Sequence, residues 1–85
     1  MTMQIDSLLT YKLKTSLQIL TTPHGGGFMA ITDGIPIYGF GQTTYEAIQK
    51  LRYELECLYN DLKDRKNLSS HWDSIRVYLD RAIEK

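Results

Sequence analysis

The stretch from Thr43 to Asp64 most constrains the fold, because it has the pattern of one long amphipathic helix. Its apolar side chains recur at steps of three and four residues, which places them on a single stripe. The stripe consists of Ala47, Ile48, Leu51, Leu55, Leu58, Tyr59 and Leu62. At about 1.5 Å per residue such a helix is about 30 Å long, enough to cover a three-stranded sheet. Thr43 and Glu46 form a capping-box pattern at its start, in which the hydroxyl accepts from a backbone N–H and the carboxylate reaches back.

Residues 11–21 alternate between apolar and polar side chains, which is typical of a half-buried strand. One face carries Leu13, Thr15, Leu17 and Ile19, and the other carries Lys12, Lys14, Ser16 and Gln18. We expect the strand to stop at the loop 22–27, which contains a proline and three glycines. The apolar face of this strand is the expected partner of the long helix.

Two further strands are predicted between the glycine loop and the helix. Residues 28–32 form the second strand, and Asp33-Gly34 after it is typical of a tight hairpin turn. Residues 35–38 form the third strand, which we place at the rim of the sheet because Pro36 cannot donate a ladder hydrogen bond. Residues 39–44 are then expected to leave the sheet.

The remaining chain predicts a polar connector over residues 61–67 and a short C-terminal helix. Ser70 and Asp73 repeat the capping pattern, so this helix should begin near His71. Together the elements predict an α+β fold, a three-stranded antiparallel sheet followed by a long helix on one face. We expect a single domain over 1–85. Its parts are an N-terminal extension (1–10), a β-β-β-α core (11–64), and a connector with the C-terminal helix (65–85).

Length and charge limit what such a chain can do. Its 85 residues leave room for one core, and ten basic against ten acidic residues give no net charge. A nucleic acid or a membrane surface would normally require a basic excess, so neither is an expected direct partner. The single cysteine, Cys57, cannot form an internal disulfide. We see no basic start followed by an apolar run, and therefore expect a cytoplasmic protein.

No arrangement of reactive side chains predicts catalysis. The histidines, His24 and His71, are far apart in sequence, and no second cysteine completes a zinc site. A Ser-His-Asp set can be drawn within residues 69–73, but its serine and aspartate already fit a capping role. The glycines 25–27 are followed by a strand rather than by a lysine and a helix, which argues against phosphate binding. We therefore expect no enzyme activity, no cofactor and no metal.

The residues at the start of the long helix resemble the HicB-like antitoxin family. The run Gly39-x-Gly41-x-Thr43-x-x-Glu46-Ala47 matches the segment in which that family's third strand opens into its helix. A glycine-containing loop before a short strand, here at 25–31, is similar as well. The two glycines are expected to make the strand-to-helix bend, and Ala47 to let the first turn approach the sheet.

This resemblance implies a partial ribonuclease-H-like fold without nuclease activity, self-association, and a small basic toxin of double-stranded-RNA-binding type as partner. Family members often add a C-terminal DNA-binding segment, and here residues 65–85 predict one helix only, too little for a helix-turn-helix. A double-stranded-RNA-binding domain also joins three strands to a helix through a similar bend. Here the helix start has Glu46 and no lysine before Lys50 to grip phosphates.

Several apolar residues have no obvious place in so small a core. They are predicted contacts with a partner or a second copy: Met3, Ile5, Leu8, Leu9, Tyr38, Phe40 and Trp72. We expect a homo-oligomer, a dimer in which the N-terminal segment takes part. The sequence thus predicts a non-enzymatic interaction protein that resembles a HicB-like antitoxin and acts by toxin occlusion. The alternative is a stand-alone dimeric structural domain with no toxin.

Overall fold

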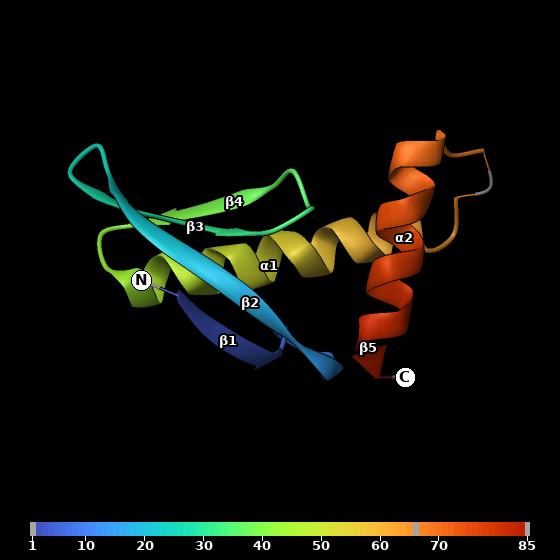
Figure 1. Ribbon diagram of the computed structural model, residues 1–85, viewed down its shortest axis with the longest axis horizontal. Coiled ribbons are helices and arrows are strands. Elements are labelled where there is room, and N and C mark those ends of the chain that lie inside the picture. Colours follow the sequence, from blue (N-terminus) through green and yellow to red (C-terminus); the bar gives the residue numbers. More distant parts are fainter. Residues whose placement is uncertain (1, 66, 85) are drawn as a thin grey trace.

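The chain folds into an antiparallel sheet backed on one face by a long helix, which confirms the predicted α+β class (Figure 1). The structure is a computed structural model that describes residues 2–65 and 67–84. The strands are β1 (Thr2–Ser7), β2 (Lys12–His24), β3 (Gly27–Thr32), β4 (Tyr38–Gly41) and β5 (Ile83–Glu84), and the helices are α1 (Thr44–Leu62) and α2 (Ser70–Ala82). The sheet order is β1-β2-β3-β4, and β5 pairs with the start of β2.

Residues 2–7, part of the segment that the sequence defined only as an N-terminal extension, are a strand of the sheet. β1 pairs antiparallel with β2 from Thr2 opposite Leu20 to Ile5 opposite Leu17, and the register shifts between Ile5 and Ser7. Ile5 and Leu8 are buried in the core. The loop after β1 is tied to α1, because the Thr10 N–H donates to Glu56 Oε1 at 2.7 Å.

The first hairpin is longer than predicted, because β2 continues through Pro23 to His24. The turn consists of Gly25 and Gly26 alone, with φ of 56° and 85°. Positive φ at both central residues is the type I′ geometry, which matches the twist of the strands on either side. β1 pairs with β2 only as far as Leu20. Beyond that point β2 has one free edge, where a proline is tolerated.

The third predicted strand, residues 35–38, is shifted along the chain. The structure places β4 at Tyr38–Gly41, where Gly39 pairs with Ala30, so residues 39–41 do not leave the sheet. Residues 35–37 form a loop in which the Ile37 N–H donates to the Ile35 carbonyl at 2.9 Å. This loop buries the Ile35 side chain in the core instead of adding it to the ladder.

α1 crosses the sheet against β4 and β3 and, at fewer places, against β2. The side chain of Thr43 caps the helix by accepting from the Glu46 N–H at 3.1 Å, as predicted. Gly39 and Gly41 do not act as bends with unusual dihedrals. A Cβ on Gly39 would collide with the backbone of Ala47 and Leu51, and one on Gly41 with Glu46. Their role is to let α1 lie directly on β4.

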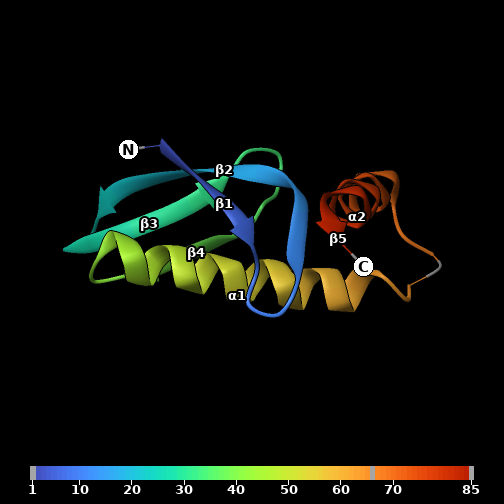
Figure 2. The same cartoon turned by 90° about the horizontal axis from the view of Figure 1, so that it is seen from below.

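α2 packs at the end of the molecule where α1 finishes and lies beside the sheet, not over its other face (Figure 2). Its N-cap is Ser69 and not Ser70, since the Ser69 hydroxyl accepts from the Trp72 N–H. One side of α2 is buried, and its buried residues are Ile75, Leu79 and Ala82. The sequence did not predict β5, which continues directly from α2 and pairs with Lys12 and Leu13.

The core lies between α1 and the covered face of the sheet. Leu17 and Ile19 from β2 meet Leu51 and Leu55 from α1 there, all at 1% exposure or less. Leu13 is only partly buried and packs at the edge of this cluster. Neither of the two helices in the described ranges is long and apolar enough to cross a lipid bilayer.

Candidate interaction surface

The face of the sheet opposite α1 is covered by neither helix, and we call it the outer face. Alternation along the strands decides which side chains it holds, because buried Ile19 and Ala30 face α1 while their neighbours point the other way. Its central residues are Thr2, Leu20, Thr22, Met29, Ile31, Tyr38 and Phe40. Most of these are apolar, although they border solvent.

The strand register arranges these side chains in two cross-strand rows. Ile31 lies opposite both Leu20 and Tyr38, and this first row ends at Thr2 opposite Leu20. In the second row Met29 lies opposite both Thr22 and Phe40. Side chains directly opposite on one face are within contact distance, so each row forms a continuous apolar band.

Three members of the rows are large apolar side chains that are exposed to solvent. Leu20 is 41% exposed, Phe40 43% and Tyr38 54%. Tyr38 and Phe40 pack edge-to-face with ring centroids 5.1 Å apart, and His24 lies 5.2 Å from Phe40. The aromatic side chains therefore form one ordered strip along β4, as expected for binding anchors.

A hollow of about 280 Å³ lies on the outer face beside this strip. Thr2, Gln18, Leu20, Ile31 and Asp33 are among the residues that line it, and we call it the outer-face hollow. It lies on the β1 side of Ile31, while Tyr38 projects on the other side of the same row. The outer face thus carries a projection and a recess next to each other.

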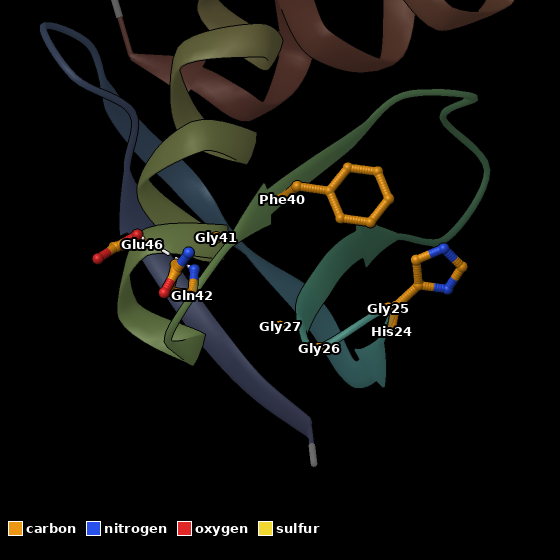
Figure 3. A pocket seen from close by; sticks show the side chains of 8 residues that line it. All are labelled: His24, Gly25, Gly26, Gly27, Phe40, Gly41, Gln42 and Glu46. Carbon is orange, nitrogen blue, oxygen red and sulfur yellow. Dashed lines mark hydrogen bonds between the residues drawn. The ribbon is translucent and has the colours of Figure 1, made fainter.

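A second hollow, of about 320 Å³, opens at the glycine turn (Figure 3). His24 and Phe40 lie on one side of it, and Gln42 and Glu46 lie on the other. The start of α1 therefore adjoins the glycine turn, although the turn is followed in the chain by a strand. Glu46 occupies that helix end, since its carboxylate accepts from the Gln42 N–H at 3.1 Å. A carboxylate there repels a phosphate, so this geometry disfavours anion binding.

The seven predicted contact residues do not lie on one surface. Tyr38 and Phe40 lie together on the outer face, as described above. Ile5 and Leu8 are 1% and 3% exposed, so their assignment to a partner surface was wrong: they complete the protein's own core. Met3 and Leu9 are exposed, but Leu9 lies by α1, where it lines a groove with Tyr45 and Gln49.

Trp72 lies away from the outer face. It is on α2, 37% exposed, and its ring packs against His71 at 5.6 Å. It lines a hollow with Leu58 and Leu68, near the end of α1. The structure therefore does not join Trp72 to the aromatic strip of β4.

Reactive side chains do not converge in the described ranges. Residues of the Ser-His-Asp set have local structural roles instead. Ser69 caps α2, and Asp73 forms an ion pair with Arg76 at 2.8 Å. Across residues 2–65 and 67–84 no group of three or more His, Cys, Asp or Glu side chains could hold a metal ion. On α1 a hydrogen bond with the Cys57 side chain raises the pKa of the exposed Tyr53, and the neighbouring Glu54 acts in the same direction. Tyr53 and Cys57 are both exposed to solvent.

Like Met29 and Ile31, Leu20 is an outer-face residue that was not among the predicted contacts. It shares its parity on β2 with Lys12, Lys14 and Gln18, so it was assigned to no surface. An exposed leucine at the end of a polar strand face was the signal that could have identified it.

Comparisons of the chain with protein families, with curated proteins and with solved structures found no match.

Proposed function

We propose that this protein is a non-catalytic interaction domain that acts by burying its outer face against another protein surface. The observation that carries this proposal is the pair of apolar cross-strand rows left uncovered by α1 and α2. The largest contiguous apolar patch on the surface of a monomer often marks an interaction site. The aromatic strip supplies the large, rigid side chains that dominate binding energy at such sites.

We further propose that its role is that of a cytoplasmic, HicB-like antitoxin. The support is the resemblance in the Gly39–Ala47 segment and a strand-to-helix unit of the kind that the resemblance implies. α1 carries four carboxylates and two cations over Thr44–Leu62, a net charge of about −2. This negative surface would attract a small basic toxin, because opposite charges steer the encounter between two proteins.

The test of the antitoxin role is co-expression with any small basic protein encoded next to this gene. We expect this protein to relieve the growth arrest that the neighbour causes, and to form a complex with it. Glu54→Lys should weaken the complex, because Glu54 is exposed on α1, whereas Glu84→Lys on β5 is the matched control. The antitoxin role is wrong if no such neighbour exists, or if the two proteins do not bind.

A stand-alone dimeric domain with no toxin is the second candidate. The specific observation in its favour is that the two rows of the outer face contain no charged side chain. A basic toxin would gain no electrostatic attraction from these rows, whereas a second copy of the same neutral surface needs none. A dimer that forms without any partner, in a chain that neutralises no toxin, would support this candidate over the first.

A further inference from the structure

The outer face has the shape that a twofold interface requires. In such an interface the same patch occurs on both subunits, so the patch must complement itself. Tyr38 projects on one side of Ile31, and the outer-face hollow lies on the other side. A twofold axis passing close to Ile31 would bring each projection over the recess of the other copy.

The charges on this face are arranged in the same self-complementary way. The rows are neutral, Asp33 lies on the rim of the outer-face hollow, and Tyr38 has a phenolic hydroxyl that can donate to a carboxylate. Among the described residues neither Asp33 nor the Tyr38 hydroxyl has a hydrogen-bond partner. One copy therefore offers the donor and the other the acceptor, twice across the axis.

We propose that a second copy of this chain packs on the outer face, sheet against sheet, with Tyr38 of each copy in the outer-face hollow of the other. Phe40 flanks this contact on each side, and the Tyr38 hydroxyl donates to the partner's Asp33 carboxylate. This inference rests on the proposal that the outer face is a contact surface, and it names the occupant. It leaves the acidic side of α1 free for another partner.

The size of the face sets the strength of this dimer. Four strands spaced about 4.8 Å apart, each contributing about six residues at about 3.4 Å, give a face of roughly 400 Å² in projection. Stable interfaces bury about 800 Å² of accessible surface on each partner, so this contact lies toward the weak end. We therefore expect a dissociation constant in the range of about 1 to 100 μM.

Sedimentation equilibrium on the full chain tests this proposal directly. The wild-type protein should change from monomer to dimer as its concentration rises through this micromolar range. Phe40→Lys should raise the dissociation constant at least about tenfold, because it places a charge against an apolar surface. Tyr53→Lys is the matched control, since Tyr53 is 51% exposed on α1, and it should change the constant less than about twofold.

A cysteine pair distinguishes this geometry from other dimers. In a Cys57→Ser background, Ile31→Cys should form an intersubunit disulfide on mild oxidation, because Ile31 lies near the proposed axis. Tyr53→Cys should not cross-link under the same conditions. Circular dichroism confirms that each variant is folded. If Phe40→Lys unfolds, Leu20→Lys replaces it in the sedimentation experiment, because Leu20 is an exposed apolar residue of the outer face.

Three other outcomes would overturn the proposal. A wild-type protein that stays monomeric at about 1 mM has no second copy on this face. If Phe40→Lys leaves the dissociation constant unchanged and Gln4→Pro dissociates the dimer, the two copies pair through the free edge of β1. If the protein is monomeric and Phe40→Lys abolishes toxin binding, the face belongs to the toxin, and the proposed function stands without this inference. By contrast, a dimer that forms through this face in a protein that binds no toxin would support this inference and contradict the antitoxin role.

Discussion

At the residue scale, two glycines decide how closely the layers of this protein pack. Gly39 is buried in β4 under the backbone of Ala47 and Leu51 of α1. Its φ is not in the left-handed region, since positive values occur only at Gly25, Gly26 and Gly34 within the described chain. Space, and not backbone freedom, therefore requires glycine at this position.

Gly39→Ala should lower the free energy of unfolding by about 1–3 kcal/mol, the usual cost of overpacking a dense interior. The new methyl group would have to displace α1 from β4, because its nearest neighbours are backbone atoms. Urea denaturation followed by circular dichroism measures the change. Glu54→Ala, on the exposed side of α1, is the control and should shift stability by no more than about 0.5 kcal/mol. Equal stability of Gly39→Ala and the wild type would show that the two layers are not in contact here.

Two adjacent leucines provide a second test at this scale. Leu8 is 3% exposed and Leu9 is 47% exposed, although they are the same residue type in the same loop. Leu8→Ala should cost about 2–5 kcal/mol of unfolding free energy, since it removes buried methyl groups and leaves a cavity. Leu9→Ala should cost less than about 0.5 kcal/mol. Chemical denaturation of both variants measures the difference, and similar losses would mean that the β1 loop does not close over the core.

At the element scale, local signals predicted some elements well and others poorly. Thr43 and Glu46 lie within four residues of each other, so their cap could be recognised without knowing the rest of the fold. β1 could not be recognised from the sequence, because the register shift after Ile5 interrupts the alternation of apolar and polar residues before Leu8. β4 was misplaced because Ile35 and Ile37 imitate a strand, whereas the actual strand contains two glycines with low strand propensity.

The residues of the outer face were likewise predictable only where the signal was local in sequence. Tyr38 and Phe40 could be predicted as contacts from the sequence, because both are large apolar residues beyond what so small a core can hold. The role of Leu20 depends on which residue of β3 lies opposite it, and that pairing spans eleven residues of chain around the glycine turn. Whether α2 would cover the outer face was also a tertiary question, because it depends on β5 anchoring α2 beside β2.

The cap of α1 gives the prediction at the element scale. Thr43→Ala should reduce the free energy of unfolding by about 1 kcal/mol, because the Glu46 N–H loses its acceptor. Thr43→Ser keeps the hydroxyl and should retain most of the wild-type stability. Thermal or urea unfolding distinguishes the two. If serine and alanine are equally damaging, the methyl group and not the hydroxyl stabilises this end of α1.

At the scale of the whole molecule, the two sides of the protein have different character. α1 and its flanks present charged side chains to solvent, while the two cross-strand rows of the outer face present apolar and uncharged ones. A contact through the outer face should therefore depend little on ionic strength, since it contains no net attraction between charges for salt to screen.

We expect the dimer dissociation constant to change by less than about twofold between about 0.05 and about 0.5 M sodium chloride, because only screened charge pairs weaken over that range. Sedimentation equilibrium at three salt concentrations measures this. A complex with a basic toxin on α1, by contrast, should weaken clearly with salt. A dimer that dissociates as salt rises would place charged residues, and not the apolar rows, at its interface.

The most direct test of the central claim, that the uncovered sheet face is where this protein makes contact, is a dilution series of amide NMR spectra. From about 1 mM to about 20 μM, a range that brackets the expected dissociation constant, shifts should move at Leu20, Met29, Ile31, Tyr38 and Phe40. The chemical shifts of amides along the exposed side of α1 should not change. Spectra that do not change with concentration, or changes confined to α1 or to the free edge of β1, would contradict the account.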